Sequence, residues 1–78
     1  MPRVAVVGQY RFFFYSNEGE EPRHIHVRHE DRLAKFWLEP VELAASKRFA
    51  SHELREIMAI VLQRREEFIE AWNEHFRN

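Results

Sequence analysis

The first half of the chain contains short runs that are β-branched, aromatic or alternately polar and apolar, patterns typical of β-strands. The runs cover Arg3–Val7, Tyr10–Tyr15, Arg23–Arg28 and Leu33–Leu38. Between the first two runs, Gly8-Gln9 is a glycine-first pair, which favours a two-residue hairpin turn. The sequence therefore predicts an antiparallel meander of three or four strands over about residues 3–38.

The second half has the spacing of an amphipathic helix over Ser51–Arg77, with Ser51 as its cap. Its apolar positions, three and four apart, are Leu54, Ile57, Met58, Val61, Phe68, Ile69, Trp72 and Phe76. Such a helix would be about 40 Å long, whereas a six-residue strand spans about 20 Å. Either the helix breaks near Gln63–Glu66, or its Trp72 and Phe76 end packs on a second chain as an oligomer contact.

The link between the two halves, residues 39–50, has the strand-ending Pro40 as its second residue. Within it, Val41–Phe49 is expected to form an irregular connection or a short extra strand. The predicted fold is therefore a single α+β domain over residues 1–78, in which the meander packs on a long C-terminal helix.

Composition excludes several classes of protein. The 78 residues contain no cysteine, which rules out disulfides, thiolate-bound zinc and a cysteine nucleophile. Twelve basic and thirteen acidic side chains give a net charge of −1, so overall charge does not single out nucleic acid as a partner. No apolar run approaches the roughly 20 residues of a membrane helix, and no signal-peptide pattern opens the chain. We expect a soluble, cytoplasmic protein that does not bind a membrane.

Strand alternation divides the predicted sheet into two faces. The apolar face, which should pack on the helix, holds Phe12, Phe14, Ile25, Val27, Phe36 and Leu38. The opposite face, named here the open face, holds Arg11, Phe13, Tyr15, His24, His26, Arg28, Lys35 and Trp37. The open face is thus cationic and aromatic, although the whole chain is not.

Three interpretations fit such a face. Aromatic rings could stack RNA bases while Arg and Lys contact phosphates. The same composition is typical of a protein–protein interface. Alternatively, the segment Val41–Phe49 could simply cover Phe13 and Trp37.

The pair His24 and His26 is the sharpest local feature, because alternate strand residues lie side by side, roughly 6.5 Å apart. Two such imidazoles could act as general base and general acid on a phosphodiester. Arg11, Arg23 or Arg28 could stabilise the charge that develops on the phosphoryl oxygens. The pair could instead ligate a transition metal, with His29, Glu30 or Asp31 as third ligand, or remain a structural or interface feature.

Several blocks of sequence resemble a bacterial family, domain-of-unknown-function family 4160. The blocks are Tyr10-Arg11-Phe12-Phe13-Phe14-Tyr15-Ser16-Asn17-Glu18-Gly19, Glu21-Pro22-Arg23-His24-Ile25-His26-Val27, Ala34-Lys35-Phe36-Trp37-Leu38-Glu39-Pro40 and Glu70-Ala71-Trp72-Asn73-Glu74. Arg23 departs from the family, whose members commonly have a second Pro before the first His. The resemblance implies an operon-encoded small protein partner of family 2442, in an arrangement similar to a toxin–antitoxin pair.

We therefore predict a component of a toxin–antitoxin-like module, on the toxin side, that cleaves RNA without a metal or other cofactor. In this hypothesis His24 and His26 are catalytic. The residues that bind RNA or a partner are Arg11, Phe13, Tyr15, Arg23, Arg28, Lys35 and Trp37. The alternative is a non-catalytic, antitoxin-side or regulatory module that docks protein or RNA on the open face. In either case we expect a homodimer or a heteromeric complex.

Overall fold

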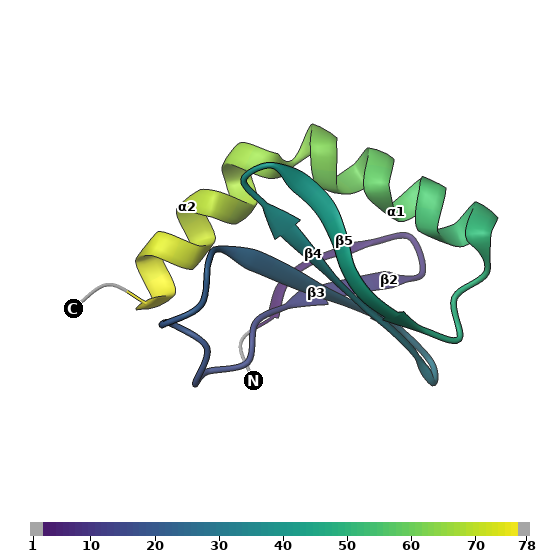
Figure 1. Cartoon of the computed structure of the whole chain (residues 1–78), viewed down its shortest axis with the longest axis horizontal. Coiled ribbons are helices and arrows are strands. Elements are labelled where there is room, and N and C mark those ends of the chain that lie inside the picture. The colour runs from purple at the N-terminus through teal and green to yellow at the C-terminus, as the bar shows by residue number, and fades with distance from the viewer. Residues whose placement is uncertain (1–2, 77–78) are drawn as a thin grey trace.

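The computed structural model describes residues 3–76 as one five-stranded antiparallel sheet with two helices on one of its faces (Figure 1). The strands are β1 (Arg3–Val7), β2 (Tyr10–Phe13), β3 (His24–His29), β4 (Arg32–Leu38) and β5 (Val41–Lys47). The helices are α1 (Ser51–Gln63) and α2 (Arg65–Phe76). The predicted α+β class and antiparallel meander are confirmed.

Each strand pairs with its neighbour in sequence, so the sheet order is β1-β2-β3-β4-β5. The predicted turn at Gly8-Gln9 joins β1 to β2, and Gly8 has a φ of 59°, a conformation that glycine adopts without steric cost. A second short turn, Glu30-Asp31, joins β3 to β4. Short hairpins of this kind fix the register of the two strand pairs that they join.

The predicted number of three or four strands was too low, because the predicted connection over residues 39–50 contains β5. Of the two alternatives for that segment, the extra strand is the one observed. β5 pairs with β4 from Val41 opposite Leu38 to Lys47 opposite Leu33. It is an edge strand whose side chains are mostly exposed, so its sequence lacks the apolar alternation that marks a buried strand.

The predicted long C-terminal helix is in fact two helices, so the predicted break is observed. α1 ends at Gln63 and α2 begins at Arg65, so the helix breaks inside the predicted Gln63–Glu66 interval. Near the break, the Arg65 Nε donates a hydrogen bond of 2.8 Å to the Leu38 carbonyl at the end of β4. The break changes the direction of the helical layer (Figure 1), and the last turn of α2, at Phe76, packs against Gly19 of the loop between β2 and β3. The predicted end at Arg77 lies outside the described residues.

The N-terminus of α1 is capped differently from the prediction. Ala50, and not Ser51, occupies the capping position, and its backbone N–H donates a hydrogen bond of 2.9 Å to Glu53 Oε1. Glu53 also accepts a hydrogen bond from Arg32, at 3.0 Å, which ties the first turn of the helix to the sheet.

The core lies between the sheet and the two helices. All six residues predicted to face the helix are at most 1% exposed: Phe12, Phe14, Ile25, Val27, Phe36 and Leu38. Across the layer, Ile57 and Val61 of α1 and Phe68 of α2 are fully buried, and the ring centroids of Phe12 and Phe68 lie 5.2 Å apart. The predicted assignment of the apolar face is confirmed.

Candidate functional site

The strand register brings the predicted open-face residues together in rows across the sheet. One row runs through Val6, Arg11, Arg28, Leu33 and Lys47, from β1 to β5. A second row joins Phe13, His26 and Lys35, and a third joins His24 and Trp37. Residues that face each other in an antiparallel sheet point to the same side. The residues of each row therefore share one face.

At one end of this face, a carboxylate from the loop between β2 and β3 meets the two strand histidines. Glu18 Oε1 lies 2.9 Å from His24 Nε2 and 2.8 Å from His26 Nε2, and Glu18 Oε2 lies 3.0 Å from the latter atom. His24 Nδ1 donates a 2.8 Å hydrogen bond to the Pro22 carbonyl. We call Glu18, His24 and His26 the Glu18 triad.

The Glu18 triad is enclosed mainly by aromatic rings. Phe13 stacks on His26 with centroids 5.4 Å apart, and Tyr15 meets His26 edge-on at 4.6 Å. β2 ends at Phe13, so no strand pairs with His24 on that side. The indole of Trp72, from α2, approaches the His24 ring there, with a centroid distance of 4.7 Å.

This enclosure sets the titration of two members of the triad. Burial lowers the pKa of His26 below its ordinary value, and the neighbouring Glu18 carboxylate only partly opposes that shift. Burial also acts to raise the pKa of Glu18, but the hydrogen bonds to His24 and His26 outweigh it and hold that pKa below its ordinary value. Glu18 is therefore ionised at neutral pH.

The open face is less accessible at this end than the sequence pattern indicates. His24 is 0% exposed, Phe13 4% and His26 6%. Glu18 and Trp72 contact His24, whereas Tyr15 packs edge-on against both Phe13 and His26. Tyr15 keeps 38% of its surface exposed. The prediction that His24 and His26 share one face of the sheet is confirmed. The expected exposure of their imidazole rings to solvent is not observed.

Two of the predicted cationic contacts are already neutralised. Arg23 forms an ion pair with Glu39 at 2.9 Å and a hydrogen bond with Asn73 at 2.8 Å. Lys35 forms an ion pair with Glu21 at 2.7 Å and lies over the Trp37 ring at 4.5 Å from its centroid. Arg23 thus links the end of the loop between β2 and β3 to α2 and to the turn after β4. Lys35 links Glu21 of the same loop to β4.

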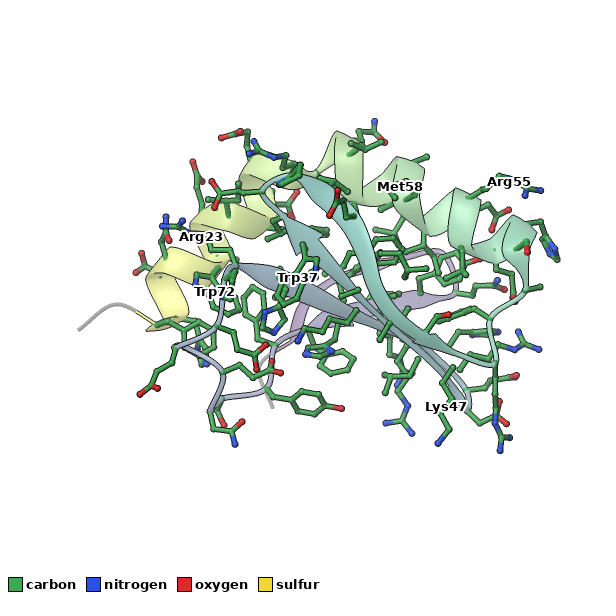
Figure 2. All side chains as sticks on the ribbon, in the orientation of Figure 1. Arg23, Trp37, Lys47, Arg55, Met58 and Trp72 are labelled. Carbon is green, nitrogen blue, oxygen red and sulfur yellow. The ribbon has the colours of Figure 1, made fainter. Side chains whose placement is uncertain are left out.

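The other end of the open face is different. Among the Arg and Lys side chains that the structure describes, those of residues 4–76, the ones without a carboxylate partner are Arg11, Arg28, Lys47 and Arg55. The first three lie in the same row of the sheet, which we call the cationic row. Figure 2 shows Lys47 below the sheet, away from the helices, whereas Arg55 projects from α1 on the other side. A hollow of about 580 Å³, lined in part by Arg11, Arg28 and Val6, adjoins the row.

The predicted oligomer contacts, Trp72 and Phe76, pack within the chain. Trp72 is 5% exposed and meets Phe14 edge-on, with centroids 5.3 Å apart. Phe76 lies against the Glu18 loop so closely that a Cβ at Gly19 would be 2.9 Å from Phe76 Cδ1. Both rings thus have partners within the chain, and their contact with a second chain stays a prediction.

Sequence reasoning missed two residues of the site. Glu18 is the third donor beside the histidines, in place of the predicted His29, Glu30 or Asp31. Its signal was only a carboxylate in an acidic loop shortly before the first histidine. Lys47 completes the cationic row, and it could be placed there only once β5 was known to pair with β4.

The fold and site define a small sheet-and-helix protein with a buried Glu-His-His cluster. The chain matches the family described as "Domain of unknown function (DUF4160)" over residues 9–73 and belongs to that family. No curated protein and no solved structure gives a match. Within residues 3–76, neither helix is long and apolar enough to cross a membrane.

Proposed function

We propose that this protein is an RNA-binding component of a bacterial toxin–antitoxin-like module, and that it binds single-stranded RNA through the cationic row. The observation that carries the proposal is the alignment of Arg11, Arg28 and Lys47 on one sheet face without carboxylate partners. The module assignment, including a partner of family 2442, rests on the family resemblance and stays a prediction.

The cationic row is electrostatically costly for the isolated chain. Arg11 lies directly opposite Arg28, and like charges in facing positions destabilise a sheet. Elsewhere on the described chain, most cations have a nearby carboxylate, for example Arg48 with Asp31 at 2.7 Å. An anionic ligand would remove the repulsion within the row and form charge-assisted hydrogen bonds with the guanidinium groups. A phosphate backbone supplies such anions at regular intervals.

The geometry of the face suits a single strand. With strands about 4.8 Å apart, the row from Arg11 to Lys47 spans about 14 Å across the sheet. Tyr15, exposed near the same face, offers a ring on which a base could stack. Aromatic stacking and phosphate contacts together are the usual means of binding single-stranded nucleic acid.

Cleavage by the two histidines is less well supported than binding. His24 is fully buried, and both of its ring nitrogens already face hydrogen-bonding partners. An acid–base pair needs two imidazole nitrogens within reach of the phosphodiester. Glu18 and its loop would have to leave before His24 could meet a substrate. We therefore expect RNA binding without cleavage, in line with the non-catalytic alternative.

The test is the affinity for a fluorescently labelled, unstructured RNA, measured by anisotropy over a range of salt concentrations. Three phosphate contacts predict that log K falls against log salt with a slope of about −2. The double variant Arg11→Ala/Arg28→Ala should bind much more weakly and with a shallower slope. Arg55→Ala is the matched control, because Arg55 also lacks a carboxylate partner but projects from α1. Equal losses in both variants, or no binding by the wild type, would contradict the proposal.

A further inference from the structure

The Glu18 triad brings three metal-ligand atoms together from two separate segments. Glu18 belongs to the loop after β2, whereas His24 and His26 are alternate residues of β3. One ligand atom from each residue lies within 4.8 Å of the other two. Two imidazoles and a carboxylate are also the ligands of catalytic zinc sites and of other transition-metal sites.

The hydrogen bonds of His24 leave its Nε2 aimed at Glu18. A carbonyl oxygen can only accept, so His24 Nδ1 must carry the proton that it donates to Pro22. In a neutral His24 ring, Nε2 then presents a lone pair to Glu18 Oε1, which is itself an acceptor, at 2.9 Å. Two acceptors at this distance repel each other unless a proton or a metal ion lies between them. Either one satisfies the contact, so the cluster accommodates a metal ion without requiring one.

The surroundings of His24 have the form that a metal site requires. A histidine that ligates a metal through one nitrogen almost always donates its other N–H to a carbonyl or carboxylate, which fixes the ring. The hydrogen bond from His24 to Pro22 supplies this interaction. The His26 ring is held in turn by its stacking on Phe13 and its edge contact with Tyr15. Both Nε2 atoms are thus aimed at one point before any ion arrives.

The nearest cation does not prevent metal binding. Lys35 lies beside His26 in the register, but its ammonium group is 2.7 Å from Glu21 Oε1 and 4.5 Å from the Trp37 ring centroid. These contacts neutralise its charge locally. Room for an ion requires the distances from Glu18 Oε1 to the two Nε2 atoms, now 2.9 and 2.8 Å, to lengthen. A tetrahedral ion with bonds of about 2.1 Å needs about 3.4 Å between its ligand atoms. Glu18 can make this adjustment because it lies in a loop and not in a strand.

We propose that Glu18, His24 and His26 form a binding site for a divalent first-row transition metal, with zinc the preferred ion at physiological availability. Three protein ligands leave a fourth position for water or another ligand, as in a catalytic zinc site. The proposal does not depend on RNA binding, because the cationic row lies at the other end of the open face.

The test is calorimetric titration of tag-free, metal-stripped protein with zinc chloride, followed by cobalt(II) absorption spectra. The wild type should bind one zinc ion per chain, and its Tm should rise with zinc concentration. Glu18→Gln keeps the size and shape of the side chain but removes its charge, and it should weaken zinc binding at least tenfold. His26→Gln removes a second ligand and should give a similar loss. His52→Ala, which alters an exposed histidine of α1, is the matched control and should bind zinc like the wild type.

Circular dichroism establishes that each variant is folded before titration. The Glu18→Gln variant is central, because substitution of the fully buried His24 could prevent folding. Unchanged zinc affinity in both folded ligand variants would overturn the proposal. The absence of zinc binding by the wild type, or an equal loss in His52→Ala, would overturn it as well. None of these results changes the RNA binding that we expect, so the two proposals can fail separately.

Discussion

Arg11 lies directly opposite Arg28 in the antiparallel pair of β2 and β3, and neither forms an ion pair with any carboxylate of residues 3–76. Facing side chains in such a pair have Cβ atoms about 5 Å apart. The two guanidinium groups therefore repel each other in the absence of a ligand. The facing pair of Arg11 and Arg28 therefore destabilises the fold of the free protein, whereas the same two charges favour the binding of an anion.

Replacing one of the two cations should improve stability and impair binding. We expect Arg11→Glu to pair with Arg28 and to raise the free energy of unfolding by about 0.2–1 kcal/mol. The same change should weaken RNA binding by about tenfold or more, since it removes one phosphate contact and adds a repulsive charge. Urea denaturation and RNA anisotropy measure the two effects. Arg11→Gln, which removes the charge without reversing it, should fall between Arg11→Glu and the wild type in both assays.

Incubation of the wild type with RNA in EDTA addresses the ribonuclease hypothesis. Because the His24 ring is fully buried and bonded at both nitrogens, we expect no cleavage. The comparison variant is His24→Ala/His26→Ala, provided that circular dichroism shows it to be folded. If the wild type cleaves RNA and this variant does not, the hypothesis of a metal-independent ribonuclease is supported. Equal cleavage by both proteins would indicate a contaminant or another site.

The contact between β2 and α2 should be essential for folding. Phe68 is fully buried against Phe12, so Phe68→Ala leaves a cavity and should lower the free energy of unfolding by about 3–5 kcal/mol. Leu62→Ala changes a helix residue that is 56% exposed and should stay within about 0.5 kcal/mol of the wild type. Urea denaturation of both variants provides the measurement. A loss in Phe68→Ala as small as that expected for Leu62→Ala would show that the core does not depend on Phe68.

Alkaline pH should destabilise the fold through Tyr10. Burial, followed by a 2.6 Å hydrogen bond to Glu56, raises the pKa of the Tyr10 phenol. A raised pKa means that the unfolded chain loses this proton first, so its contribution is complete below about pH 10 and is lost as pH rises further. Urea midpoints across this range should therefore fall more steeply in the wild type than in Tyr10→Phe. The control Tyr15→Phe should keep the steep fall, and a steep fall in Tyr10→Phe would assign it to another group.

Much of the fold could be predicted because the apolar positions follow two clear periods. The two-residue period separates Phe12 from Phe13, and the helical spacing after Ser51 predicts a covering layer. By contrast, nothing local signals the break after Gln63, where the chain has neither Gly nor Pro. The bond from Arg65 to the Leu38 carbonyl is a tertiary contact that only the assembled sheet makes possible. β5 was equally hard to predict, since an exposed edge strand has no apolar face.

Only the strand residues of the candidate site could be predicted from the sequence. Alternation along β3 places His24 and His26 on the same face, which the register confirms. Glu18 reaches them through a loop, and loop paths leave no periodic trace in the sequence. The burial of His24 was likewise hidden, because its cover comes from α2. Sequence could therefore indicate which side chains face together, but not which of them remain accessible.

The contact of His24 with Trp72 also bears on how the protein is made. During translation the strand that carries His24 emerges from the ribosome well before the helix that carries Trp72. The hairpins are local and can form early, whereas this ring contact must wait until almost the whole chain has been released. The enclosed imidazole is thus among the last features to be completed, and a nascent chain that stops before α2 would expose it to solvent.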